Sequence, residues 1–173
     1  QSNQRTDNYG GSLANRLRFL REVAEAVVGA IGAERVGVRL SPFLNINGTS
    51  DANPYETFLG AAKALKQVGV VYIHLSEAAA VSAESTSAPE DFLQQLRAIY
   101  DGTIIVCGGF DGPRARKSLA SGLVDLIGFG KPFIANPDLV HRLADELPLA
   151  QADRATFFGG GEKGYTDWPA YGG

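Results

Sequence analysis

An alternation of apolar runs and amphipathic stretches, repeated four times, constrains the fold of this chain most strongly. Val, Ile and Leu are concentrated in short runs that lie within residues 35–42, 70–75, 103–107 and 123–129. Such runs, separated by helical patterns, are typical of a parallel sheet with helices covering at least one face. We therefore expect an α/β fold made of four strand–helix units in series.

The expected helices carry their own boundary signals. Residues 12–32 place apolar side chains at steps of three and four and end at a glycine. Asn53, Pro54 and Glu56 provide an N-cap, a first-turn proline and the acid of a capping box, and Gly69 is a stop signal. The other helices are expected at about 92–99, at 111–121 and from 136 onwards.

Two parallel α/β architectures fit this alternation. A doubly wound sheet would be complete at 173 residues, whereas a (β/α)8 barrel needs about 250 residues and would be only half present. The dinucleotide fingerprint GxGxxG is absent from every strand-to-helix turn, which weakens the doubly wound interpretation.

Composition narrows the possible partners. A net charge of −3 and a pI near 5.4 argue against nucleic acid, whose binding needs many Lys and Arg contacts to phosphates. No apolar run approaches the length of about 20 residues that spans a bilayer, and no signal-peptide pattern opens the sequence. We expect a cytoplasmic protein without a membrane partner.

Two single features add to this. Cys107 is the single cysteine and is expected in the core. The polar start at Gln1 indicates a piece of something longer.

The fourth apolar run ends in a pattern suited to holding a phosphate. Gly128, Gly130 and Lys131 stand between an expected strand and the helix that follows. Glycine lets backbone N–H groups approach an anion, a helix start presents unpaired N–H groups, and lysine adds a full charge. The alternative is that these glycines form an ordinary turn.

Unusual residues also follow other expected strands. Arg39 lies in the first strand, Gly108 and Gly109 follow the third, and an aromatic pair, Phe157 and Phe158, stands near the carboxyl end of the chain. Because parallel strands end at one edge of a sheet, these positions can converge on one ligand. If the third and fourth strands are the last two of a barrel, their glycine turns fall where barrels commonly hold phosphate.

Four longer motifs carry a resemblance to a known family. They span residues 3–16, 38–42, 133–139 and 156–169, and together they resemble the old yellow enzyme family, with most similarity to the bacterial ene-reductase branch that includes N-ethylmaleimide and nitrate-ester reductases. The resemblance implies that residues 1–173 are the carboxyl-terminal half of a flavin-binding (β/α)8 barrel. It further implies an FMN cofactor that takes hydride from NAD(P)H and passes it to an activated C=C bond or a nitro group.

Carried over by position, the resemblance assigns roles to single residues. Arg39 would lie beside the flavin N1 and C2 carbonyl region and stabilise the reduced anion. The FMN phosphate would be held by the backbone amides of two turns, Gly108 with Gly109 and Gly130 with Lys131. The ammonium of Lys131 would add a positive charge. Phe157 and Phe158 would lie near the dimethylbenzene edge of the flavin and the substrate mouth.

This sequence departs from the family pattern at three positions. Many members have Arg at the position of Lys131, several have Tyr at Phe158, and some have Asn or Ala at Gly109. The resemblance also implies that the substrate-clamping His and Asn and the proton-donating Tyr come from the amino-terminal half. We therefore expect this chain alone to be a poor catalyst, with the missing half or a second copy of itself as partner.

Simpler interpretations remain open at this stage. Arg39 can form a salt bridge at a strand end, and both phenylalanines can be core residues. His74 and His141 match no catalytic position. At the level of the whole chain, a non-catalytic, phosphate-binding half-barrel that dimerises is the main alternative. An aldolase-like barrel is less favoured because no strand interior contains a lysine that can form a Schiff base.

Overall fold

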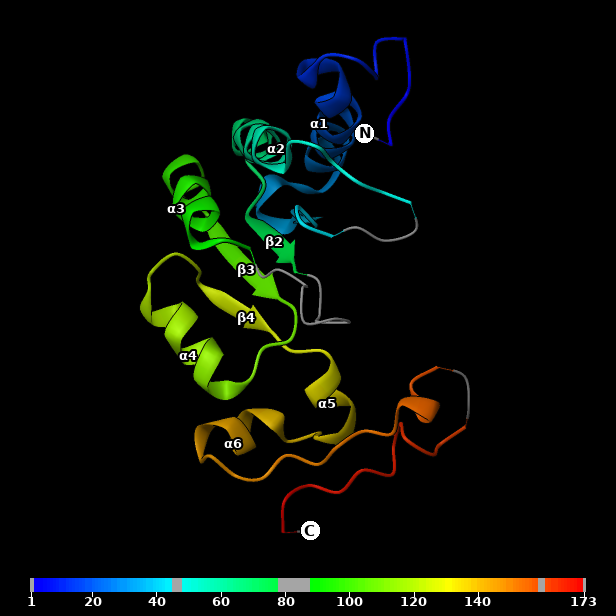
Figure 1. Cartoon of the computed structure of the whole chain (residues 1–173), viewed down its shortest axis with the longest axis vertical. Coiled ribbons are helices and arrows are strands. Elements are labelled where there is room, and N and C mark those ends of the chain that lie inside the picture. Colours follow the sequence, from blue (N-terminus) through cyan, green and yellow to red (C-terminus); the bar gives the residue numbers. More distant parts are fainter. Residues whose placement is uncertain (1, 45–47, 78–87, 159–160, 173) are drawn as a thin grey trace.

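The computed structural model describes residues 2–44, 48–77, 88–158 and 161–172 and contains a four-stranded parallel sheet. The strands lie in sequence order (Figure 1), and they are β1 (Gly37–Leu40), β2 (Tyr72–Ser76), β3 (Thr103–Cys107) and β4 (Leu126–Gly128). Arg39 is in register with His74, and Cys107 with both Ser76 and Gly128. The predicted strand–helix alternation is confirmed, and the sheet has two open edges, β1 and β4.

Six α-helices and two short 3₁₀ helices connect and follow the strands in the described part of the chain. They are α1 (Leu13–Ile31), a 3₁₀ turn (Ala33–Arg35), α2 (Pro54–Val68), α3 (Glu90–Ile99), α4 (Gly112–Ala120), α5 (Lys131–Ala135), α6 (Leu139–Ala144) and a second 3₁₀ turn (Arg154–Thr156). The N-cap at Asn53 and the stop at Gly69 are those that the sequence predicts, but the capping box is not formed, because the Asn53 amide donates to the Asp51 carboxylate at 2.8 Å and not to Glu56. Asn53 accepts a hydrogen bond from the Glu56 amide, and Gly69 ends α2 in the left-handed conformation with φ 88°.

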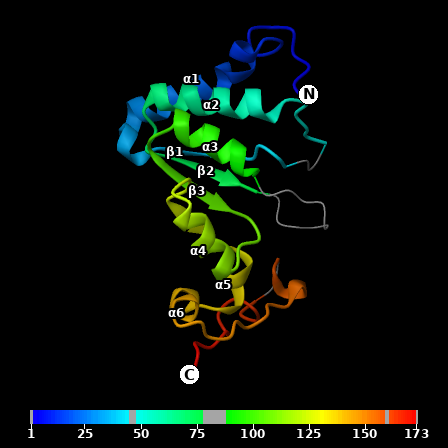
Figure 2. The same cartoon turned by 60° about the vertical axis from the view of Figure 1, so that its left-hand side comes forward.

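In the part of the chain that the structure describes, helices cover only one face of the sheet. Figure 1 shows α2, α3 and α4 to the left of the strands, and in Figure 2 α1 packs beside α2. Strand residues alternate accordingly, because successive side chains point to opposite faces. Ile73, Leu75, Ile104 and Val106 are fully buried against the helices. Phe92 of α3 completes this core, with edge contacts to the rings of Phe43 and Tyr55.

The opposite face of the sheet has no helix over it among the described residues. Its side chains include Arg39, Tyr72, His74, Cys107 and Leu126, all of which are exposed or only partly buried. Leu126 is 53% exposed. In a closed barrel this face would line the interior, so its exposure is what half a barrel would show.

The structure corrects three details of the sequence interpretation. The fourth strand is Leu126–Gly128 and not the whole of 123–129, because the carboxylate of Asp125 turns back to accept the Ile104 amide at 2.8 Å. A short helix, α5, precedes the helix that was expected from residue 136. Cys107 is not a core residue: it is half-buried on the uncovered face of the sheet.

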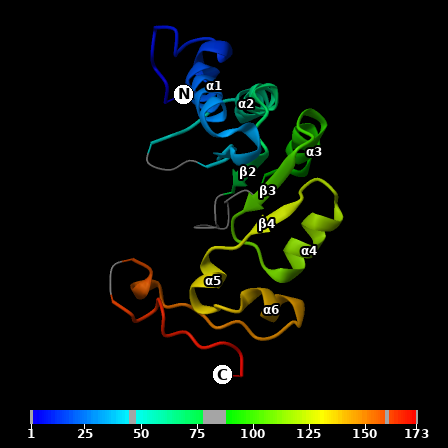
Figure 3. The same cartoon turned by 180° about the vertical axis from the view of Figure 1, so that it is seen from behind.

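The carboxyl-terminal segment forms a separate layer beyond the ends of the strands, below the sheet in Figures 1 and 3. Buried polar side chains hold it. The Asn136 amide donates to the carbonyls of Pro132 and Ala150, at 2.7 and 3.0 Å, and accepts from the Ala150 amide. Arg142 donates to the Pro148 and Pro169 carbonyls, each at 3.1 Å. No described helix is both long and apolar enough to cross a membrane.

Candidate functional site

A cavity of about 450 Å³ lies at the carboxyl ends of the strands. The residues that line it are Arg39, Ser76, Glu77, Cys107, Gly108, Gly109, Phe110, Gly128, Phe129, Gly130, Lys131 and Pro132. Five of the seven residues that the sequence predicts at the cofactor site therefore line one cavity. Its volume falls in the range of about 300–1,000 Å³ that is usual for small-molecule sites.

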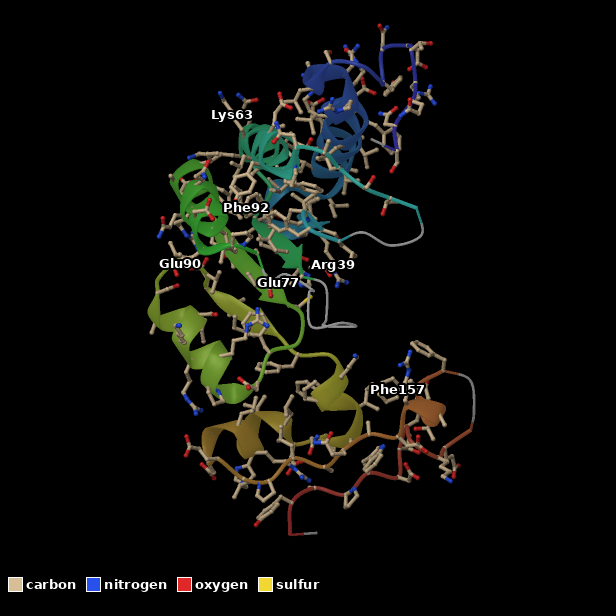
Figure 4. The ribbon with its side chains drawn as sticks, viewed as in Figure 1. Arg39, Lys63, Glu77, Glu90, Phe92 and Phe157 are labelled. Carbon is tan, nitrogen blue, oxygen red and sulfur yellow. The ribbon has the colours of Figure 1, made fainter. Side chains whose placement is uncertain are left out.

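Arg39 extends from β1 across the uncovered face toward β3. Its Nη2 donates to the Ser76 hydroxyl at 2.9 Å and contacts the Cys107 sulfur at 3.4 Å. Within the described ranges the guanidinium forms no ion pair with a carboxylate. The strand-end salt bridge considered above is thus absent there, and an uncompensated positive charge lies at the cavity wall. Figure 4 labels Arg39 at the ends of the strands, where it lines the same cavity as Glu77.

The loop after β3, Gly108–Gly109, which we call the β3 loop, needs its glycines. Gly108 has φ +135°, and a Cβ there would lie 2.7 Å from the Glu77 carbonyl oxygen and 2.8 Å from the Glu77 Cβ. Gly109 has φ +60°. Its N–H donates to no acceptor in the described part of the chain. The β3 loop thus presents an unpaired backbone donor beside the cavity.

The loop after β4, Gly130–Lys131, which we call the β4 loop, is more open. Both residues are exposed, and a Cβ at Gly130 would meet nothing within 4 Å. The Gly130 amide and the Lys131 ammonium have no partner among the residues described. The two loops therefore offer an anion two backbone donors and one full positive charge on the same rim.

The aromatic pair is divided by the structure. Phe157 is half-buried and lines a neighbouring hollow of about 290 Å³, which it shares with Lys131, Pro132 and Arg154. Phe158 is 88% exposed, so the interpretation of both rings as core residues is wrong for Phe158. Neither ring lines the main cavity (Figure 4 labels Phe157), and Gly159 and Gly160 of the same motif lie outside the described residues.

Sequence reasoning missed three side chains of this site. Ser76 ends β2, Glu77 directly follows it, and Cys107 ends β3, so the strand-end rule that found the glycines would also have found them. Glu77 is 8% exposed and pairs with Arg114 of α4. Burial raises the pKa of the Glu77 carboxyl above its ordinary value, and the contact with Arg114 opposes this shift.

His74 lies on the strand next to that of Arg39, and its side chain is on the same face of the sheet. Its Nε2 is buried without a hydrogen-bond partner in the described structure. Burial lowers the pKa of His74, and the charge of Arg39 lowers it further. His74 is therefore a neutral side chain beneath the cavity. The described residues also contain no group of three His, Cys, Asp or Glu side chains placed to hold a metal ion.

Comparisons with known proteins agree on one family. Residues 1–150 match a family described as NADH:flavin oxidoreductase / NADH oxidase. The chain is 39% identical over 170 residues to the putative 12-oxophytodienoate reductase 11 of Oryza sativa subsp. japonica, covering 98% of this chain and 46% of that protein. It is 39% identical over 169 residues to 12-oxophytodienoate reductase 2 of Arabidopsis thaliana, covering 97% of this chain and 45% of the relative.

Solved structures share the fold as well as the sequence. Morphinone reductase superposes with a TM-score of 0.92 at 43% identity, over 98% of this chain and 45% of that one. An old yellow enzyme homologue from Zymomonas mobilis gives 0.89 at 36% identity, over 96% and 47%. The chain thus spans a little under half the length of these relatives, and its four parallel strands correspond to half of their (β/α)8 barrel.

Proposed function

Because the chain belongs to the NADH:flavin oxidoreductase / NADH oxidase family, whose members include old yellow enzyme, we propose that it provides the FMN phosphate and flavin N1-side contacts of an NAD(P)H oxidoreductase. In this proposal residues 1–173 are the carboxyl-terminal half of the barrel. The complete enzyme would reduce activated C=C bonds or nitro and nitrate-ester compounds.

The cavity at the strand ends carries this proposal, because its donors fit FMN. One rim of the cavity combines the unpaired amides of Gly109 and Gly130 with the ammonium of Lys131, which suits a phosphate. Arg39 adds a second positive charge on the wall formed by β1. A ligand with an anionic end and a polar ring that gains negative charge on reduction matches both features.

When bound, FMN would accept a hydride from NAD(P)H and pass it to the acceptor. The residues of this chain prepare the site for that chemistry. Arg39 is fixed by Ser76 and Cys107, so its charge need not reorganise when negative charge develops near it. Gly108, Gly109, Gly130 and Lys131 anchor the phosphate, and the partly buried Phe157 borders the neighbouring hollow. The solved complex of morphinone reductase with tetrahydroNAD supports a nicotinamide donor.

The proposal assigns the remaining parts of the reaction to a partner. No described cavity residue is a Tyr, and His74 lies beneath the cavity and not in its lining. The substrate clamp and the proton donor would come from the other half of the barrel. That half, or a second copy of this chain, would also cover the open sheet face and pair the two edge strands.

Flavin spectroscopy tests the proposal. The protein should bind FMN and show the visible absorbance band of the bound flavin. When the barrel is complete, NADPH or NADH should bleach this band under anaerobic conditions. An Arg39→Gln variant should lower the flavin reduction potential, because a stabilising charge is lost. Arg35→Gln, which changes an exposed arginine outside the cavity, is the matched control. A protein that binds inorganic phosphate but no flavin would favour the non-catalytic half-barrel instead.

A further inference from the structure

A buried ion pair lies directly behind the β3 loop. Glu77, whose side chain is 4% exposed, contacts the Arg114 Nη2 with one carboxylate oxygen, and its other oxygen accepts the Ala88 amide at 3.0 Å. Arg114 also donates from Nη1 to the Gly108 carbonyl at 2.8 Å. One guanidinium thus connects the carboxylate after β2 to the backbone after β3.

Arg114 is itself held in place by two further contacts. Its guanidinium carbon lies 3.9 Å from the centroid of the Phe110 ring, and its amide donates to the Asp111 carboxylate at 2.8 Å. Stacking on Phe110, together with the bonds to Glu77 and Gly108, leaves the side chain little rotational freedom, and the cap fixes the backbone that carries it. A fixed donor of this kind can hold a peptide group in one orientation.

The peptide that Arg114 holds is the one between Gly108 and Gly109. A trans peptide is planar, so its carbonyl and its N–H point in opposite directions. Because Arg114 binds the Gly108 carbonyl from the α4 side, the Gly109 N–H points away from Arg114. Gly109 lines the cavity and Arg114 does not. Both glycines have positive φ, so the loop has other accessible backbone conformations in which this peptide would turn over.

We propose that Glu77 and Arg114 are positioning residues for anion binding: the pair fixes the peptide after Gly108 so that the Gly109 N–H faces the cavity. The inference builds on the proposed function, because it takes the anion to be the phosphate of FMN. Glu77 keeps Arg114 extended toward the loop, and Arg114 sets the direction of the donor without touching the ligand.

Three variants test the pair. Glu77→Gln keeps the shape but removes the charge, Arg114→Gln removes the donor to Gly108, and Arg114→Lys keeps the charge without the planar fork. The matched control is Arg97→Gln. Arg97 also bridges a carboxylate and a carbonyl, with Asp125 and Gly102 as partners, but it lies at the opposite end of the strands.

The first measurement is independent of flavin. Nitrogen-15 relaxation should give Gly109 an order parameter of about 0.85 in the wild type, falling below about 0.6 in Glu77→Gln and Arg114→Gln, and remaining unchanged in Arg97→Gln. Arg114→Lys should give an intermediate value. If Gly109 stays as ordered in both charge-removing variants as in the wild type, the inference is wrong, whether or not the protein binds flavin.

The second measurement separates positioning from general stability. In the full-length protein, Glu77→Gln and Arg114→Gln should raise the Kd for FMN about tenfold while the Kd for riboflavin, which has no phosphate, changes less than about twofold. Equal weakening of FMN and riboflavin would overturn the inference. A wild-type protein that binds neither flavin would contradict the proposed function, and the order parameter of Gly109 would then still decide the positioning role.

Discussion

The β3 loop and the β4 loop face the same cavity but are built differently. In the β3 loop, a Cβ added at Gly108 would lie within 3 Å of Glu77 atoms, and the guanidinium of Arg114 donates to the Gly108 carbonyl. In the β4 loop, a Cβ at Gly130 would meet nothing within 4 Å, and the Lys131 ammonium has no ion-pair partner among the described residues. One loop is a fixed arrangement of backbone and the other is an exposed charge.

This difference indicates a division of labour in binding an anion. A fixed N–H group provides geometry, because it loses no conformational entropy when the ligand arrives. A lysine on a flexible stem provides attraction and adapts to the position of the anion. We therefore expect mutations in the β3 loop to disturb folding and binding together, and mutations in the β4 loop to disturb binding alone.

The largest effect should come from Gly108→Ala. The new Cβ would clash with the backbone of Glu77, and φ +135° is unfavourable for any residue with a side chain. We expect the free energy of unfolding to fall by about 3 kcal/mol, with loss of FMN binding. Urea denaturation and a flavin titration measure the two effects.

The matched control for that change is Gly130→Ala. With φ −107° and no atom within 4 Å of the new Cβ, it should alter the free energy of unfolding by less than about 0.5 kcal/mol. Equal destabilisation by the two alanines would remove the distinction between the loops.

Lys131→Ala should have the next largest effect, and on binding only. Removing the ammonium should raise the Kd for FMN about tenfold and leave the urea midpoint unchanged, because Lys131 is exposed and contributes no ion pair to the described fold. Lys131→Arg should restore or improve binding through a bidentate contact. A Kd that is insensitive to Lys131→Ala, or to ionic strength, would show that this charge does not face the anion.

Gly109→Ala should be milder than Gly108→Ala. Its φ of +60° lies in the left-handed region, but the nearest atom to the new Cβ is the Arg114 Nη1 at 4.0 Å, so strain is the main cost. We expect a loss of about 1 kcal/mol in the free energy of unfolding. Gly109→Asn, which tolerates this region better, should lose less, and a larger loss for Asn than for Ala would contradict this explanation.

Most of the scaffold could be predicted from the sequence because its signals are local. Asn53, Pro54 and Gly69 define the ends of α2 by interactions within one turn, and the structure has them in those roles. The strand-end position of Arg39 and the glycines also follows from a local rule, since parallel strands end at one edge. The short α5 was missed because its five residues carry no periodic pattern.

The supports of the site could not be predicted in the same way. Glu77 and Arg114 are 37 residues apart and come together only because β2 and β3 are neighbours and α4 folds back on them. Their pairing has no spacing signal. Cys107 was misplaced for a related reason: an apolar strand in half a barrel has one covered face and one uncovered face, and its composition does not say which side chains face the helices.

The smallest predicted effect concerns His74, beneath the base of the β4 loop. The ring is partly buried, its Nε2 is buried without a partner in the described structure, and a Cβ at Gly128 of β4 would lie 3.8 Å from that atom. The pKa of His74 is lowered by burial in the folded state, whereas the unfolded value is about 6.5. Below that pH the unfolded chain binds the extra proton more readily, so stability should fall as the pH falls through about 6.5 and be fully present above it. Urea midpoints at pH 7.5 and 5.5 should therefore differ more for the wild type than for His74→Gln. An identical pH dependence in wild type and His74→Gln would mean that this ring is not held neutral by the fold.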